Sequence, residues 1–229
     1  MPLPGRIHAM NPLLVLGSKN YSSWSLRPWL FLRKVAFDFR ELVIHFDAAD
    51  YRAQIARFSP SSRVPLLVDS EVKIWDSLAI CEYAAECTGR GLPSSRTARA
   101  VARAAAAEMH SGFQALRNEY PMNIRARDRR VPMTAQLKSD IERIDALWAE
   151  CRTAYGAGGG WLFGEFSIAD AMFSPVMFRF QSYGAELRPE SAAYLRHALA
   201  DPVLGEWQSA AEQEGHPLPR VDQHGESQN

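Results

Sequence analysis

The sequence predicts an α/β domain with a mixed sheet, followed by an all-α domain of bundled helices. Two patterns lead to this prediction: strand and helix signals alternate over the first ninety residues, and nearly every later segment has helical periodicity. The length of 229 residues accommodates two domains of about 100 residues each.

The first strand and helix are predicted from an apolar run and a proline. Leu13–Leu16 is a short apolar run that ends at Gly17, which is typical of a buried strand. A hydroxyl-rich loop follows, and then a helix to about residue 37. Pro28 is expected in the first turn of that helix, where its missing N–H costs nothing, so the helix should begin near Trp24 or Ser25.

The rest of this half is expected to contain a strand and a short helix, then a hairpin of two strands, and then another helix. The expected elements are a strand at 39–46, a short helix at 51–58, a hairpin of strands at 66–68 and 72–75, and a helix from 76–77 to about 87. The order βαβ, a connection, then ββα is that of a thioredoxin-like domain. We therefore expect an extension at 1–12, a thioredoxin-like domain at 13–89 and a linker at 90–96.

The second half, 97–213, is expected to be all-helical, with a loose polar tail at 214–229. Apart from one glycine, residues 97–120 lack helix-breaking residues, so the sequence predicts a single long helix there. Further helices are expected at 134–154, after Ser167, at 190–200 and at 202–213.

Composition excludes several classes of protein. Lys and Arg number 26 against 26 Asp and Glu, which argues against a dedicated nucleic-acid binder. No apolar run approaches the roughly 18 residues of a membrane helix, and residues 1–11 show no secretion signal. Three cysteines without a C-x-x-C pair predict neither a disulfide scaffold nor a metal site, so we expect a cytoplasmic protein without a metal.

A first candidate site combines Val64-Pro65 with Asp76-Ser77. The residue before a proline is held extended, so Val64 is suited to pair with an extended peptide. Asp76 and Ser77 stand at a predicted helix N-terminus, which favours a carboxylate ligand, and Asp76 suits a ligand ammonium group. The alternative is structural: Ser77 caps its helix and Pro65 ends a loop.

A second candidate site is the serine-rich loop before the first helix. A serine hydroxyl at a helix N-terminus stabilises an anion such as a thiolate, with help from the helix dipole. Ser25 is the better candidate for capping the helix, which leaves Ser22 and Ser23 for this role.

These features resemble those of the cytosolic glutathione S-transferases over about residues 13–213. Ser167 and Asp170 form an S-x-x-D capping box similar to one in the helical domain of that family. The resemblance implies that Val64 binds the cysteinyl backbone of glutathione, with Pro65 beside it in the glutathione site. It also implies that Asp76 and Ser77 bind the γ-glutamyl end and that Arg63 reaches the glycyl carboxylate.

The Ser22-Ser23 pair resembles the serine-type zeta class, whose motif reads S-S-C and whose members act as maleylacetoacetate isomerases. By that match Ser22 is the catalytic serine and Ser23 its neighbour, while Trp24 stands where zeta members have cysteine.

A third group of residues is expected to line a pocket for a second, acidic substrate. It comprises His110, Gln114, Arg117, Met122 and Arg179, with His110 as a proton carrier and Arg179 near the substrate-binding arginine of zeta members. The alternative is a structural histidine beside a solvated arginine loop.

The resulting hypothesis is a homodimeric enzyme that uses glutathione as co-substrate. It ionises the glutathione thiol for conjugation of a small electrophile or for its cis–trans isomerisation. One rival is a non-catalytic ligand carrier or protein-interaction module of the same fold. A thiol-disulfide oxidoreductase is disfavoured, because no cysteine stands at the N-terminus of the first helix.

Overall fold

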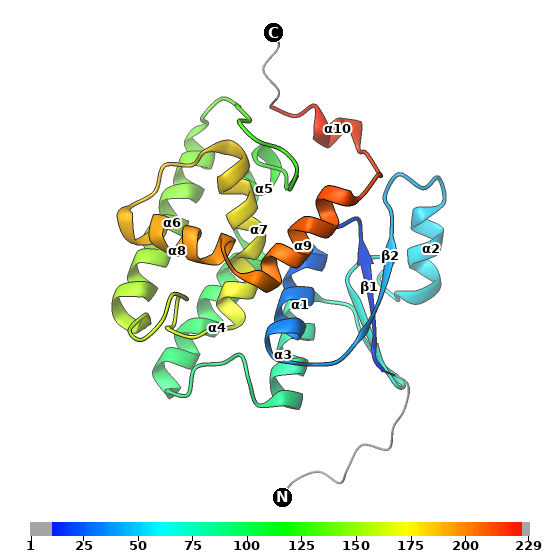
Figure 1. Ribbon diagram of the computed structural model, residues 1–229, viewed down its shortest axis with the longest axis horizontal. Coiled ribbons are helices and arrows are strands. Elements are labelled where there is room, and N and C mark those ends of the chain that lie inside the picture. The colour runs from blue at the N-terminus through cyan, green and yellow to red at the C-terminus, as the bar shows by residue number, and fades with distance from the viewer. Residues whose placement is uncertain (1–10, 226–229) are drawn as a thin grey trace, which may run out of the picture.

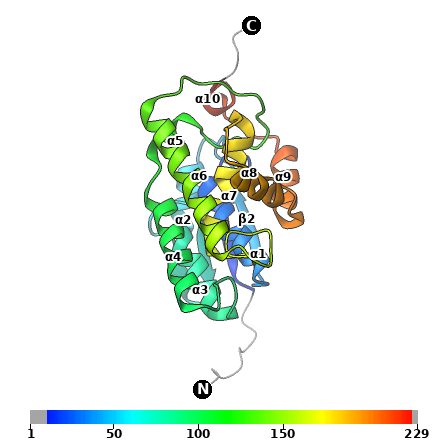
Figure 2. The same ribbon diagram turned by 90° about the vertical axis from the view of Figure 1, so that its left-hand side faces the viewer.

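The structure is a computed structural model that describes residues 11–225 (Figures 1 and 2). The predicted extension at 1–12, apart from its last two residues, and the last four residues of the predicted tail lie outside the described residues. Its four-stranded sheet has the order β2-β1-β3-β4, in which β1 is parallel to β2 and antiparallel to β3. The strands are β1 (Leu13–Gly17), β2 (Arg40–Ile44), β3 (Leu66–Asp69) and β4 (Val72–Ile74).

Helices cover both faces of the sheet and form the second half of the chain. Figure 1 shows α2 on the outer face of the sheet, while α1 and α3 lie between the sheet and the remaining helices. The predicted thioredoxin-like domain followed by an all-α domain is thereby confirmed. The helices are α1 (Ser23–Lys34), α2 (Tyr51–Phe58), α3 (Ser77–Thr88), α4 (Arg96–Ser111), α5 (Gln114–Glu119), α6 (Ala135–Tyr155), α7 (Ile168–Tyr183), α8 (Pro189–Leu199), α9 (Pro202–Gln213) and α10 (Pro219–Asp222).

The central strand β1 divides the core in two. Leu14 and Leu16 belong to the large cluster that continues through α1 into the helical half, whereas Val15 packs with Ile55 of α2. Successive side chains of a strand point to opposite faces, so both faces of β1 are buried. The core is thus continuous from the sheet to α7. The segment between α3 and α4 contains no regular element, and the domain division at 90–96 stays a prediction.

Helix α1 begins earlier than predicted. It starts at Ser23 with Ser22 at the N-cap position, so Pro28 lies in the second turn and not in the first. The prediction placed Ser25 as the cap, but Ser25 lies within the helix. Its Oγ accepts hydrogen bonds from the Gly17 amide at 3.0 Å and from the Ser22 hydroxyl at 2.8 Å. The serine therefore ties the helix to the end of β1.

The prediction of a single helix at 97–120 is wrong, because the helix is interrupted between α4 and α5. Phe113 adopts a left-handed conformation with φ 61° and its side chain is buried. The break leaves carbonyl groups at the end of α4 without helical partners. The Arg117 guanidinium donates to the carbonyl oxygens of Met109, His110 and Gly112 and so closes that end.

The capping box at the start of α7 is present as predicted. Asp170 is fully buried, and its carboxylate accepts hydrogen bonds from the Ser167 amide and hydroxyl at 2.8 Å each. It also accepts from the Leu162 amide at 3.0 Å and from the Tyr194 hydroxyl at 2.9 Å. This carboxylate thus joins the loop before α7 to α8.

The predicted loose tail is wrong for the part of it that the structure describes. After α9 the chain continues along the N-terminal half and forms the short helix α10. Glu214 and Asp222 are hydrogen-bonded to residues 19–21, as detailed below. Within residues 11–225 the helices are all too short or too polar to span a bilayer.

Candidate functional site

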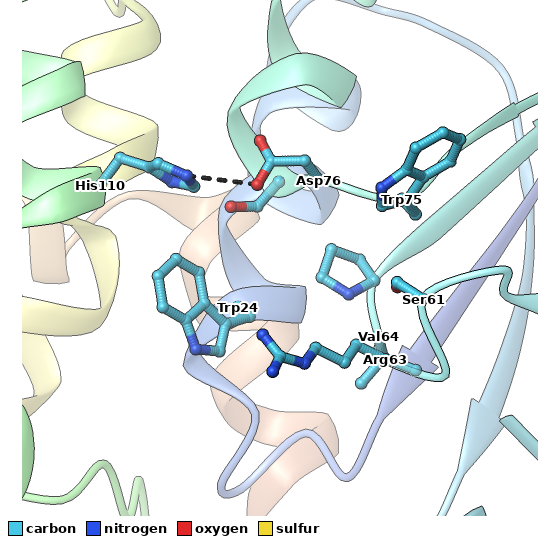
Figure 3. Close-up of a pocket in the computed structure, with 9 residues that line it drawn as sticks. Trp24, Ser61, Arg63, Val64, Trp75, Asp76 and His110 are labelled. Carbon is cyan, nitrogen blue, oxygen red and sulfur yellow. Dashed lines mark ion pairs between the residues drawn. The ribbon is translucent and has the colours of Figure 1, made fainter. Parts of the chain in front are cut away.

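Two adjoining cavities lie beside the N-terminus of α1, and the first of them extends to α4. The first has a volume of about 470 Å³ and the second about 650 Å³. Four residues line both of them: Trp24, Ser61, Arg63 and Val64. The first cavity, shown in Figure 3, is completed by Pro65, Trp75, Asp76, Ser77 and His110. The second is completed by Tyr21, Ser22, Ser23, Phe46, Tyr51, Arg52, Ile55 and Ser62.

The Asp76-Ser77 end of the first cavity is built by the start of α3. Asp76 is the N-cap residue, and its Oδ1 accepts from the amides of Leu78 at 2.9 Å and Ala79 at 3.0 Å. Its Oδ2 lies 3.2 Å from His110 Nε2 of the helical half (Figure 3). Capping is therefore performed by Asp76 and not by Ser77, which rules against the structural alternative for Ser77.

Ser77 has no structural task for its hydroxyl group. The residue is 2% exposed, and its Oγ has no hydrogen-bond partner among the described residues. A buried polar atom without a partner costs free energy, and such atoms in native structures usually meet a ligand or water. The Ser77 hydroxyl lies on the wall of the cavity, beside the positive end of a helix dipole.

The Val64-Pro65 peptide forms the floor between the two cavities. This bond is cis, and Pro65 directly precedes β3. Val64 lines both cavities, whereas Pro65 lines only the first. Arg63 is exposed beside them, and its guanidinium group extends toward Trp24 in Figure 3. An extended ligand that crosses from one cavity to the other must pass Val64.

The two serines line the second cavity at the N-terminus of α1. Ser22 and Ser23 are 5% and 8% exposed, respectively. The Ser22 hydroxyl donates to Ser25 Oγ, while the Ser23 hydroxyl has no hydrogen-bond partner within the described chain. A ligand anion at this helix end would therefore meet one uncommitted hydroxyl and one that must turn away from Ser25.

Trp24 is a cavity residue that the sequence identified only as a departure from a motif. Two guanidinium groups lie over its ring: the guanidinium carbon of Arg27 is 4.4 Å from the ring centroid, and that of Arg117 is 4.8 Å from it. His110 meets it in an edge-to-face contact with centroids 5.4 Å apart. The indole thus joins α1 to α4 and α5 and forms a wall common to both cavities. Ser61, Trp75, Tyr51 and Arg52 are further cavity residues that were not predicted.

Of the residues predicted for a second-substrate pocket, only His110 lines these cavities. Arg117 lies behind Trp24, where burial lowers the pKa of its guanidinium group. Gln114 is exposed and hydrogen-bonded to Asn118, and Met122 is buried in the core. Arg179 is buried and donates to the carbonyl oxygens of Arg117 and Tyr120.

Burial, together with the charge of Arg117, lowers the pKa of Arg179 to about 9. Burial, with the charges of Arg117 and Arg179, holds the pKa of the fully buried Arg27 well below its ordinary value. Arg27 donates through Nε to the Met172 carbonyl oxygen. These arginines form a buried positive region behind Trp24. Within residues 11–225 no group of three or more His, Cys, Asp or Glu side chains is arranged to hold a metal.

Known proteins with the same arrangement decide the family. Residues 21–87 match the family described as glutathione S-transferase, N-terminal domain. Residues 21–87 are a glutathione S-transferase domain, and the whole chain has the glutathione S-transferase fold. The predicted resemblance to the glutathione S-transferases is confirmed for this N-terminal domain and for the fold of the chain.

Individual relatives of the chain are distant. Maleylacetoacetate isomerase of Rattus norvegicus is 23% identical over 187 residues, which are 80% of this chain and 84% of that protein. A glutathione transferase homolog from Burkholderia with bound glutathione is 20% identical, with a TM-score of 0.67 over 89% of this chain and all of the other. A glutathione S-transferase from the Antarctic clam Laternula elliptica is 21% identical, with a TM-score of 0.65 over 93% of this chain and 99% of the other.

Proposed function

We propose that this protein binds glutathione across the two cavities and ionises its thiol for attack on a small electrophile. The γ-glutamyl carboxylate accepts from the Ser77 hydroxyl, and its ammonium group meets Asp76. The cysteinyl backbone pairs with Val64, and the sulfur lies at the N-terminus of α1 beside Ser22 and Ser23. The observation that carries the proposal is the buried, unpartnered Ser77 hydroxyl in a cavity that Val64 connects to the serine pair.

The glycyl carboxylate is assigned to Arg63, with Arg52 as a second cation in the same cavity. Arg63 lines both cavities and is exposed, so its side chain is free to follow a ligand. Asp76 is shared in this arrangement, because His110 already faces its Oδ2. A bound ammonium group would compete with His110 or lie beside it on the same carboxylate.

The reaction begins when the glutathione thiol loses its proton to solvent. The Ser22 hydroxyl and the positive end of α1 stabilise the thiolate that remains. In conjugation the thiolate sulfur bonds to an electrophilic carbon, and the leaving group departs with its electron pair. In isomerisation the thiolate adds to a cis double bond conjugated to a carbonyl group, and the electron pair moves to the carbonyl oxygen. Rotation about the new single bond and expulsion of the thiolate then give the trans isomer and regenerate glutathione.

The test is the ultraviolet absorbance of the thiolate of bound glutathione near neutral pH. A free thiol has a pKa of about 8.5, so a bound thiol that is mostly ionised at pH 7 demonstrates activation. We expect the signal in the wild type and its loss in Ser22→Ala. If Ser23→Ala abolishes the signal and Ser22→Ala leaves it, the catalytic role belongs to Ser23. An absent wild-type signal, with glutathione bound, contradicts the proposed enzyme.

One observation favours a second candidate, a glutathione-binding carrier without catalysis. The Ser22 hydroxyl donates to Ser25 Oγ and is thus already committed to a contact within the protein. A carrier would bind glutathione as the thiol, so the same absorbance experiment separates the two functions. We further propose that the protein is a cytoplasmic homodimer, as the family resemblance implies. Light scattering of the purified protein tests the dimer, because it measures the mass in solution.

A further inference from the structure

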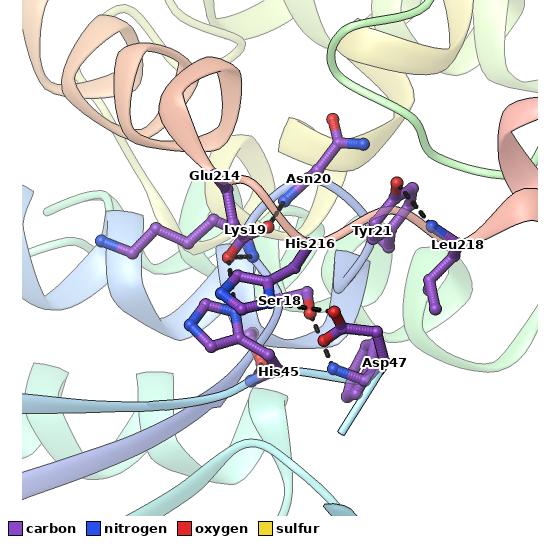
Figure 4. Close-up of polar contacts among 12 residues, drawn as sticks. Ser18, Lys19, Asn20, Tyr21, His45, Asp47, Glu214, His216 and Leu218 are labelled. Atoms are coloured by element: carbon purple, nitrogen blue, oxygen red, sulfur yellow. Dashed lines mark hydrogen bonds and ion pairs between the residues drawn. The ribbon is translucent and has the colours of Figure 1, made fainter. Parts of the chain in front are cut away.

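The segment that follows α9 is fastened to the turn that precedes the serine pair (Figure 4). Residues 18–21 form a tight turn in which the Ser18 carbonyl oxygen accepts from the amides of Tyr21 at 3.2 Å and Ser22 at 2.8 Å. The amides of Lys19 and Asn20 point out of this turn. Both donate to the Glu214 carboxylate, at 2.9 Å and 3.1 Å, respectively. We name residues 214–222 the C-terminal strap.

Glu214 occupies a position that is locally unfavourable for a carboxylate. It is the C-cap residue of α9, where the helix dipole is negative, and the last turn of α9 contains no basic residue. Its side chain is 6% exposed, and His45 Nδ1 lies 3.3 Å from Oε1. A local preference violated in this way is commonly offset by a tertiary contact. Here the offset comes from the two amides of the turn.

A second carboxylate of the strap holds the last residue of the turn. The Tyr21 hydroxyl donates to Asp222, with its oxygen 2.8 Å and 2.9 Å from the two carboxylate oxygens. The same hydroxyl accepts from the Leu218 amide at 3.0 Å and from Arg125 Nη2 at 2.6 Å. Burial raises the pKa of Tyr21, and its hydrogen bond to Asp222 raises it further, so the hydroxyl stays protonated as a donor.

The opposite side of the turn is held by the loop after α5. The Asn20 side chain donates to Asn123 Oδ1 at 2.9 Å and accepts from the Arg125 amide at 3.0 Å. Asn123 in turn donates to Asp222 at 2.9 Å, and the indole nitrogen of Trp207 in α9 donates to the Lys19 carbonyl oxygen. Two distant segments thus hold the turn whose end sets the position of Ser22.

We infer that Glu214 and Asp222 are positioning residues for the serine pair. Neither lines the two cavities, so each acts through the turn and not on the ligand. The inference rests on the proposed function, because it assigns to the strap the orientation of the group that stabilises the thiolate. Loosening the turn displaces the Ser22 hydroxyl and the first amides of α1. It leaves Asp76 and Ser77, which belong to α3, unchanged.

The test compares Glu214→Ala and Asp222→Asn with the control Glu212→Ala. Glu212 lies on the same helix end but is exposed, and its carboxylate contacts only Gln208 and Arg127 among the described residues. We expect the apparent pKa of bound glutathione to rise by about one unit in both strap variants, a tenfold loss in ionisation constant. Glutathione affinity measured below pH 6, where the thiol is protonated, should stay within about twofold of wild type. The control should match wild type in both measurements.

An unchanged thiol pKa in the strap variants, with Ser22→Ala still effective, overturns the inference and leaves the proposed function intact. If Glu214→Ala does not fold, Asp222→Asn decides alone, because it preserves the size of the side chain. If wild type forms no thiolate, the proposed function fails. Hydrogen exchange of the Ser22 and Ser23 amides then decides the strap: faster exchange in Glu214→Ala than in the control supports its hold on the serine pair, and equal exchange overturns it.

Discussion

Replacing Ser77 by alanine should weaken glutathione binding strongly and leave the unliganded protein as stable as before. The Ser77 hydroxyl is buried and makes no hydrogen bond within the described residues, so its removal breaks no contact of the free protein. In the complex the same hydroxyl donates to the γ-glutamyl carboxylate. A hydrogen bond to a charged group contributes about 1.5–3 kcal/mol. At about 1.4 kcal/mol per factor of ten, Kd should rise roughly 10- to 150-fold.

Stability gives the second half of this prediction. Removing a buried hydroxyl without a partner loses no hydrogen bond, so the free energy of unfolding should remain equal or rise slightly. Asp76→Ala provides the contrast, because the Asp76 carboxylate caps α3 through the amides of Leu78 and Ala79. Loss of such a cap costs about 1 kcal/mol, so this variant should lose both affinity and stability.

Titration calorimetry with glutathione and thermal unfolding without it measure the two quantities. A Kd of Ser77→Ala within twofold of wild type would show that no ligand carboxylate meets this hydroxyl. A fall in Tm equal to that of Asp76→Ala would show that the hydroxyl has a structural partner. Either result refutes the assignment of the γ-glutamyl end to the start of α3.

Three further predictions concern stability. Asp170→Asn should lower the free energy of unfolding by about 2–4 kcal/mol in urea titrations, because an amide nitrogen cannot accept from the donors that surround this buried carboxylate. Gly159→Ala should destabilise the protein in the same titrations, because its Cβ would overlap the Gly164 carbonyl oxygen, whereas Gly205→Ala, with open space within α9, should stabilise it by about 0.5–1 kcal/mol. The hydrogen bond to His216 lowers the pKa of Asp47. The stabilisation of the fold by this contact is therefore fully present above the ordinary carboxyl pKa and is lost as the pH falls through the lowered value. The difference in Tm between wild type and His216→Ala should therefore shrink over that acidic range, and a constant difference would contradict it.

Elements whose signals are local were predictable from the sequence. The first strand and the capping box at Ser167 follow from a short apolar run and from hydrogen-bonding residue types at fixed spacing. The start of α3 follows in the same way from Asp76. Val64 and the serine pair were expected in one ligand site, and the structure brings them to adjoining cavities.

Features that depend on distant partners were not predictable. A lone glycine such as Gly112 does not by itself end a helix. The break before α5 requires Phe113 in a left-handed conformation, and burial of the Phe113 ring offsets the free-energy cost of that conformation. The docking of Glu214 depends on two backbone amides about 195 positions earlier in the chain, which no pattern near Glu214 indicates. Trp24 differs from the zeta motif, and only the fold reveals that it forms a wall of both cavities.

The charge distribution now has a structural explanation that changes its meaning for the substrate. Residues 90–130 contain nine basic and three acidic side chains, an excess that would suit an acidic electrophile if these cations faced the ligand. Yet several of these arginines donate to backbone carbonyl groups at helix ends and in loops. Arg117 does so at the end of α4, and Arg127 donates to the carbonyl oxygens of residues 124 and 126. Cations used in this way satisfy orphaned carbonyl groups and are not available to a ligand. Within the two cavities the arginines are Arg63 and Arg52, both from the N-terminal half. A preference for an acidic electrophile would therefore depend on Arg63 and on His110, and not on the basic segment as a whole. His110 already faces a carboxylate, because its Nε2 lies 3.2 Å from Asp76 Oδ2.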